Sequence, residues 1–428
     1  FIERYRFHLA GDSATDKTIV NPGKLSEERG SHVCAQCHGL WVDTLHAMRE
    51  WVIHGEQFRA GDDLNILREY IRPNDEKQKK ILNEIVPDFQ QAWFWPDGVV
   101  RVTGNEYTGL IESPCFEDAP EGQRMTCLSC HAMHPARDDA RNLNEWADDQ
   151  LKPGMRGDQG CLQCHEKIRE DIPAHTHHPA DSSGSRCYNC HLPHTTYGLP
   201  TAIRSHQIQT PDARESVASG RPNGCNQCHL DKTLEWTGNH LNEWHGTPKP
   251  ELTEEQKNTA ASVLWILKGD AVQRALAAWT YGWKPAMSVS GRGWTTPFLA
   301  QLLVDPYDAV RLMAYKSYRQ TLMPHQDPPV YDFVGPPEER EAVSKKILND
   351  LRRARRELAT PVDLPASPDA SIVDLFGIPR EKIRYEPSPL TAAETNSHVL
   401  LNPHGFLDRE RFDRLLKERD DTPIILRE

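Results

Sequence analysis

Five copies of one short motif carry most of the chemistry that this sequence offers. Each is a Cys-x-x-Cys-His run, and all five precede residue 247 of the 428-residue chain. Two thiols three residues apart can add to the two vinyl groups of one haem, and the histidine that follows supplies a nitrogen to the iron. The cysteines that we expect to attach haem are Cys34, Cys37, Cys127, Cys130, Cys161, Cys164, Cys187, Cys190, Cys225 and Cys228. The proximal iron ligands that we expect are His38, His131, His165, His191 and His229, so the sequence predicts five covalently bound haem c groups.

Cysteine pairs also form halves of zinc sites, which need two such pairs for each ion. Five pairs do not divide into twos, and every pair here is followed by histidine although only 20 of the 428 residues are histidine. A thioredoxin-like redox pair would occur once rather than five times. The repeated motif therefore favours haem attachment over both alternatives.

Each haem iron needs a second axial ligand unless it binds a substrate. Seventeen of the 20 histidines precede residue 247, more than five bis-histidine haems require. Methionine is the alternative ligand and would raise the potential of its haem. The distal candidates that we favour are His54, His134, His175, His178 and His206. The reserve candidates are His8, His32, His46, His177 and His194.

The eleventh cysteine, Cys115, belongs to no motif and precedes Cys127 by 12 residues. An odd cysteine outside the cytoplasm can pair between chains or remain a free thiol. Thiolate ligation of a haem iron is a further alternative. Three interpretations therefore stay open for Cys115: an inert thiol, an inter-chain cross-link, and a ligand or catalytic sulfur.

Histidine usage also divides the chain, because only three histidines follow residue 246 and the run GTPKPE at 246–251 is typical of a turn or linker. We expect a mainly α fold in three parts. Residues 1–246 would form a multihaem cytochrome domain with little regular structure, whose core is largely porphyrin. Residues 247–358 would form a helical domain, and residues 359–428 a mostly irregular extension with one short helix.

Apolar residues recur at helical spacing in the second part. The expected helices are Thr253–Leu267, Asp270–Trp283, Pro297–Val304, Pro306–Arg319, Glu338–Leu358 and, in the extension, Leu407–Glu418. The stretch LLVDPYDAVRLMAYKSYRQ resembles a HEAT repeat, and the earlier LKGDAVQRALAAW resembles one more weakly. Repeat stacks usually need three or more units. A small HEAT-like domain that leans on the haem domain is therefore the expectation.

The order CHLP, SHQI, CNQCH across residues 187–230 resembles the last two haem sites of the pentahaem cytochrome c nitrite reductases. The chain also resembles the broader cytochrome c554-like proteins with doubled CxxCH motifs, over about residues 30–246. This resemblance implies electron transfer through closely spaced haems. The nitrite reductases have lysine as the proximal ligand of the catalytic haem, whereas all five motifs here end in histidine.

Net charge and hydropathy limit the kinds of partner and the location that the protein can have. The net charge of −12 argues against nucleic-acid binding and favours a positively charged patch on a partner. The longest apolar run, Ala260–Leu267, is far shorter than a bilayer span, so we expect no transmembrane segment in the given chain. We also expect no signal or anchor within it. Covalent haem attachment takes place outside the cytoplasmic membrane. The expected location is therefore periplasmic, cell-surface or extracellular.

Two functions follow from these features. The first is an electron carrier whose haems are mostly bis-histidine and whose partners are redox proteins, either other cytochromes or copies of itself. The alternative is an oxidoreductase that acts on a small nitrogen or sulfur compound at one haem with an open distal side. A high-spin haem would distinguish the second function from the first.

Overall fold

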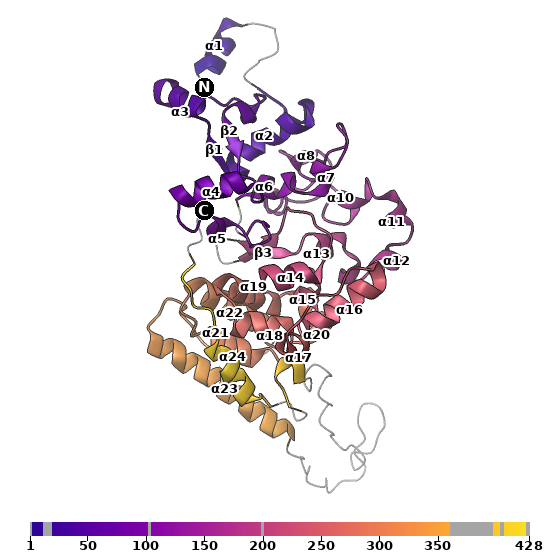
Figure 1. Cartoon of the computed structure of the whole chain (residues 1–428), viewed down its shortest axis with the longest axis vertical. Helices are drawn as coiled ribbons and strands as arrows, with labels where there is room; N and C mark the ends of the chain where they lie inside the picture. The colour runs from indigo at the N-terminus through magenta and orange to yellow at the C-terminus, as the bar shows by residue number, and fades with distance from the viewer. Residues whose placement is uncertain are drawn as a thin grey trace.

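A computed structural model of the chain describes residues 2–11, 19–101, 104–197, 201–324, 326–359, 397–402 and 406–424. The fold is mainly α-helical, as the sequence predicts. Figure 1 shows the N-terminal elements at one end of an elongated molecule, the motif-bearing helices in the middle and a block of longer helices at the other end.

The part of the chain before residue 247 consists of short helices joined by turns. The 3-10 turns here are η1 (Pro22–Lys24), η2 (Leu64–Ile66) and η3 (Ser183–Ser185). The α-helices are α1 (Ile2–Ala10), α2 (Glu27–His38), α3 (Leu45–His54), α4 (Glu76–Ile85), α5 (Phe89–Trp93), α6 (Glu106–Ile111), α7 (Pro114–Glu117), α8 (Cys127–Cys130), α9 (Leu143–Ala147), α10 (Gln159–Leu162), α11 (Glu166–Glu170), α12 (Ile172–Thr176), α13 (Cys187–His191), α14 (Ala213–Ser219), α15 (Gly224–Cys228) and α16 (Leu234–His245).

Two small antiparallel strand pairs interrupt these helices. Strand β1 (Trp41–Asp43) pairs with β2 (Arg68–Tyr70), and β3 (His194–Tyr197) pairs with β4 (Thr201–Arg204). In the second pair, His194 lies opposite Arg204. This hairpin packs against α19 of the helical block.

Apolar side chains are unevenly distributed along this part. Between residues 128 and 212, the stretch with the second, third and fourth motifs, the described residues include only three buried apolar side chains, Trp146, Leu162 and Pro193. Two small clusters lie earlier, around Phe58 and Tyr107 and around Phe89 and Phe94. Since a domain needs one hydrophobic core, this stretch lacks the apolar side chains to build one alone.

The second part holds longer helices around a large apolar core. They are α17 (Glu254–Asn258), α18 (Ala261–Leu267), α19 (Ala271–Tyr281), α20 (Lys284–Ser290), α21 (Thr296–Leu302), α22 (Asp308–Thr321), α23 (Pro337–Ala359), η5 (Ser397–Val399) and α24 (Arg409–Lys417). Helix α18 packs on α19, α21 on α22, and α19 on α22. The core contains Tyr281, Trp294 and Phe298, which meet at ring-centre distances of 5.3–6.3 Å.

The expected helix Thr253–Leu267 is two helices in the structure, with extended backbone at Thr259. Thr253 caps the first of them through the backbone N–H of Gln256, and the apolar run belongs to the second. Helix α20 was not expected, although Pro285 stands in its first turn, where proline is favoured. The other expected helices lie close to their predicted bounds.

The C-terminal segment returns to the helical block. Four of its apolar side chains are buried in the core of that block: Val399, Leu400, Phe412 and Leu415. The sequence, from which we expected a mostly irregular extension, did not predict this packing. Helix α24 matches the predicted short helix, and residues 360–396 lie outside the described residues.

A buried ion pair ties this segment to the repeat-like helices. The Nε of Arg274 donates to Asp305 at 2.7 Å, and both side chains are fully buried. The same guanidinium donates to the backbone oxygen of Asp420 at 2.8 Å. Removing Asp305 would leave the buried guanidinium with only the half-exposed Asp421 as a carboxylate partner, at 3.4 Å, and removing Arg274 would leave the buried Asp305 carboxylate without its close partner.

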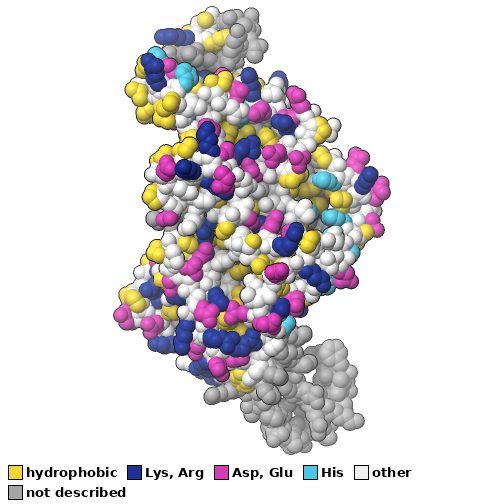
Figure 2. All heavy atoms as spheres, in the orientation of Figure 1, with side chains coloured by type: hydrophobic (Ala, Val, Ile, Leu, Met, Phe, Trp, Pro, Cys, Tyr) yellow, Lys and Arg dark blue, Asp and Glu magenta, His cyan; other side chains and the backbone are white. Residues whose placement is uncertain are grey.

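The two parts of the chain join through α19. Trp95 and Val99 from the first part form one apolar cluster with Val272 from the second. Arg101 forms an ion pair with Asp270 at the start of α19. On the face shown in Figure 2, acidic and basic side chains are intermixed, and histidine atoms reach the surface on the flank around α11 and α12. Among the described residues, no helix combines the length and hydrophobicity needed to cross a bilayer.

Candidate metal centres

Every Cys-x-x-Cys-His motif falls on a single helical turn. Four motifs occupy the end of α2 and the helices α8, α13 and α15, with the histidine at or just after the helix end. The third motif begins in α10, and its second cysteine and histidine follow in the turn before α11. Residues three apart lie on the same side of a helix. The two cysteines of a motif therefore project together, which is the local geometry that attachment to one porphyrin needs.

Three of the five proximal histidines face a second histidine at nearly the same distance. The ring-centre separations are 6.3 Å for His131–His206, 6.1 Å for His175–His191 and 6.0 Å for His178–His229. The interplanar angles are 25°, 8° and 38°. Each pair joins a motif histidine to one of the favoured distal candidates.

This separation matches two imidazoles that bind one metal from opposite sides. With each nitrogen about 2.0 Å from the metal, the ring centres lie about 6.3 Å apart. Rings in direct stacking contact would lie closer. The three pairs therefore fit the axial ligand set of a six-coordinate haem iron, in which the porphyrin supplies the other four nitrogens.

Hydrogen bonds orient the rings of four of these histidines. In each of them, Nδ1 lies 2.6–3.1 Å from a backbone oxygen. The pairs are His131 with Asp149, His191 with Gln209, His206 with Arg204 and His178 with Thr176. A carbonyl oxygen only accepts, so Nδ1 carries the proton and Nε2 keeps its lone pair. Metal-binding histidines are commonly oriented in this way.

Burial also favours the neutral form of three of the paired imidazoles. Burial lowers the pKa of His191 and of His206, and it lowers the pKa of His229 to about 4. A neutral imidazole is the form that binds a metal. One ring of each pair is thus held in the protonation state that ligation requires.

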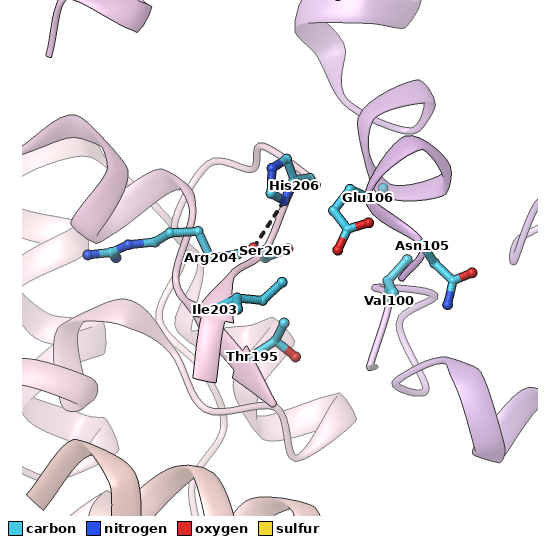
Figure 3. A pocket seen from close by; sticks show the side chains of 9 residues that line it. Val100, Asn105, Glu106, Thr195, Ile203, Arg204, Ser205 and His206 are labelled. Atoms are coloured by element: carbon cyan, nitrogen blue, oxygen red, sulfur yellow. Dashed lines mark hydrogen bonds between the residues drawn. The ribbon is translucent and has the colours of Figure 1, made fainter. Parts of the chain in front are cut away.

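The first motif differs from the others. The Nδ1 of His38 lies 2.8 Å from a carboxylate oxygen of Glu106, a hydrogen bond that raises the pKa of His38. Its side chain is 59% exposed. Figure 3 shows that Glu106 lines a pocket together with His206, so one carboxylate lies between the first motif and the ligand pair of the second. Within the described residues, neither His38 nor the exposed His165 of the third motif faces a second histidine ring at comparable distance.

Thiols of consecutive motifs lie next to each other. Cys34 of the first motif shares a hydrogen bond with Cys127 of the second, which lowers the pKa of Cys34 and raises that of Cys127. Cys161 of the third motif shares one with Cys187 of the fourth, with the same two directions. These contacts connect the first motif to the second and the third to the fourth.

Close backbone approach makes the two remaining connections. A Cβ added to Gly160, in the third motif's helix, would stand 3.4 Å from the sulfur of Cys130 in the second. A Cβ added to Gly224, at the start of α15, would stand only 2.6 Å from the backbone oxygen of Asn189 in the fourth motif. The five motifs therefore follow one another in space in the order in which they occur in the sequence.

A small cavity of about 40 Å³ adjoins the fifth motif. Its lining includes the facing pair His178 and His229 together with Cys225 and Cys228. A Cβ on Gly184 would come within 2.2 Å of the His178 ring, so the position of this ring depends on glycine there. The attachment sulfurs and both candidate iron ligands thus border the same empty space.

Aromatic side chains from α16 form another wall of this cavity. Trp236, His240 and Trp244 follow one another at helical spacing, with neighbouring ring centres 4.5 and 4.7 Å apart. At the far end His177 stacks on Trp244 at 4.6 Å. This reserve candidate is therefore engaged with an indole rather than opposite a motif histidine.

The other distal candidates occupy different surroundings. His8, His46, His54 and His134 are exposed, and none of them has a ring contact among the described residues. His54 instead lies 3.8 Å from Glu50, one turn earlier in α3. The structure does not bring these four histidines to a motif histidine, because each projects from a surface segment.

The two remaining reserve candidates are buried. His32 accepts a hydrogen bond on Nδ1 from the backbone N–H of Leu64 at 3.2 Å, so its proton is on the opposite nitrogen from that of the paired histidines. His194 packs against Trp279 and Trp283 at 4.4 and 4.7 Å, and its Nδ1 has no hydrogen-bond partner.

Sequence reasoning did not select His245. Its ring centre lies 5.4 Å from that of His175 and 5.7 Å from that of His177. The histidine-rich run AHTHHP and the end of α16 therefore meet in space. The regular spacing of aromatic residues along α16 was the available signal for this packing.

Cys115 lies beside the third motif. Burial raises its pKa, and the nearby sulfurs of Cys161 and Cys164 raise it further. The three interpretations of this thiol remain predictions. A thiol of raised pKa is less nucleophilic at neutral pH than a free cysteine.

No three histidine, cysteine or acidic side chains converge as a metal group in the part of the chain that the structure describes. A haem iron takes only two ligands from the protein, so the histidine pairs are the relevant geometry. No protein-family model, curated protein or solved structure matches this chain.

Proposed function

We propose that this protein is a pentahaem c-type cytochrome that transfers electrons between extracytoplasmic redox partners. The observation that carries the proposal is the set of three histidine pairs with ring centres 6.0–6.3 Å apart, each including the histidine of a Cys-x-x-Cys-His motif. The hydrogen bonds at Nδ1 leave Nε2 of the described rings available to an iron. When bound, haem would supply a one-electron redox centre at each motif.

The spatial order of the motifs supports a continuous route. Neighbouring motifs are connected through Cys34 and Cys127, through Cys161 and Cys187, and through the approach of Gly224 to the fourth motif. Porphyrins attached at adjacent motifs would lie close together. A chain of close centres passes electrons without any catalytic side chain.

The shortage of apolar side chains supports a haem core. Only three apolar side chains are buried among the residues described between positions 128 and 212, those of Trp146, Leu162 and Pro193. Attached porphyrins would supply the missing apolar surface. Because covalent haem attachment occurs on the outer side of the cytoplasmic membrane, the proposal includes an extracytoplasmic location, with other cytochromes or further copies of itself as partners.

A second candidate function is supported by the first and third motifs. His38 and His165 face no second histidine among the described residues, and His38 is 59% exposed. An iron at either position would have an open side. The chain would then be an oxidoreductase for a small nitrogen or sulfur compound.

Haem counting by the pyridine haemochrome method and low-temperature EPR test both functions. Five haems per chain with only low-spin signals would support the electron carrier. A high-spin signal from one or two haems in five would support the enzyme, and His38→Ala or His165→Ala would show which motif produces it. Fewer than three low-spin haems would contradict the three histidine pairs.

A further inference from the structure

A groove away from the paired histidines combines aromatic walls with positive charge. It lies between the α19–α20 turn and α22, next to the start of β4, has a volume of about 590 Å³ and is open to solvent. Its main side chains are Trp279, Trp283, Lys284, Lys316 and Arg319.

The two indoles are held in place from behind. Their ring centres lie 5.8 Å apart with an interplanar angle of 27°, and both side chains are half-buried. His194 packs against both indoles. A Cβ on Gly282 would stand 2.6 Å from the hydroxyl oxygen of Ser317, so glycine allows α19 and α22 to meet at the end of the groove.

The charge of the groove is opposite to that of the whole protein. Three exposed cations line it, and its lining includes no aspartate or glutamate. The chain as a whole has a net charge of −12. A concave site with charge of one sign concentrates small ions of the other sign.

We propose that this groove binds a small planar aromatic anion. Flat indole walls favour a planar ring system, because offset stacking adds to the burial of apolar area. The cations favour a carboxylate, sulfonate or phosphate on that ring. A concave site of this size suits a small molecule.

The groove also adjoins the fourth motif. The guanidinium carbon of Arg204 lies 5.5 Å from the ring centre of Trp283 and 4.7 Å from that of Tyr188, which is inside the motif. A bound aromatic anion would therefore lie one side chain away from the residues that we propose to attach the fourth haem. The binding site itself does not depend on haem attachment, since none of the lining residues belongs to a motif.

Isothermal titration calorimetry of the full-length protein tests this proposal. The probe is anthraquinone-2-sulfonate, and 2-(hydroxymethyl)anthraquinone is its neutral counterpart. We expect saturable 1:1 binding of the sulfonate that weakens as salt is added, and binding of the neutral compound at least about tenfold weaker. No binding, or equal binding of both compounds, would overturn the proposal.

Substitutions locate the site. Lys284→Glu should raise the Kd for the sulfonate about fivefold or more, and Trp283→Ala should raise it about tenfold. Lys24→Glu makes the same charge change on an exposed residue of η1 and should leave the Kd within about twofold. Equal losses in the two lysine variants would overturn the assignment to the groove, even if the tryptophan variant failed to fold.

Discussion

The carboxylate of Glu106 should lower the potential of the haem that we propose at the first motif. It accepts a hydrogen bond from Nδ1 of His38 at 2.8 Å, whereas the other oriented rings donate to neutral backbone oxygens. A charged acceptor makes the imidazole a stronger electron donor and so stabilises the oxidised iron. Glu106→Gln keeps the size of the side chain and an acceptor oxygen but removes the charge.

The expected shift follows from the difference between the two hydrogen bonds. Bonds to charged groups contribute about 1.5–3 kcal/mol and neutral ones about 0.5–1.5 kcal/mol, a difference of about 1 kcal/mol. A tenfold change is about 1.4 kcal/mol and, for one electron, about 59 mV. The Gln variant should therefore raise one of the five midpoint potentials by about 40 mV.

Spectroelectrochemical titration of the purified protein measures this shift. Glu112→Gln is the matched control, because the Glu112 carboxylate bonds to Arg72 at 2.7 Å rather than to a histidine. It should leave all five potentials in place. Unchanged potentials in Glu106→Gln, or the same shift in both variants, would refute the reasoning.

Three further perturbations address ligation and stability. His206→Gly should make about one haem in five high-spin by EPR, because His131 loses the ring that faces it. His134 is exposed, so His134→Gly should leave the spectrum unchanged. Identical spectra for the two variants would contradict the pairing. Gly224→Ala should lower the free energy of unfolding by about 1–3 kcal/mol in denaturant titrations, because the added Cβ would stand 2.6 Å from a backbone oxygen. At Gly157 the structure has room for a Cβ, so Gly157→Ala is the control. Equal losses of stability in the two variants would argue against this close approach. Asp305→Ala should cost about 3–5 kcal/mol, because it removes the only fully buried carboxylate partner of the buried Arg274 guanidinium and leaves the half-exposed Asp421 at 3.4 Å. A loss under about 1 kcal/mol would show that this pair matters little.

The local features of this protein could be predicted from its sequence. Cysteines three apart and followed by histidine mark the proposed attachment points whatever surrounds them. Apolar spacing placed α19, α22 and α23, since helical periodicity is a property of a short segment. The break before Ala260 was missed because the apolar run hides the extended backbone at Thr259.

The approach of distant segments could not be predicted in the same way. His206 faces a motif histidine 75 positions away, and His175 and His178, three residues apart, face two different motifs. His134, close in sequence to the second motif, lies exposed instead.

The sequence by itself therefore determined the number of candidate centres, their proximal ligands and the helical character of the chain. Only the tertiary structure decided which histidines face each other, because a ring pair about 6 Å apart depends on how separate segments pack. Contacts such as that of Gly224 with the fourth motif, which permit this packing, leave no periodic signal in the sequence.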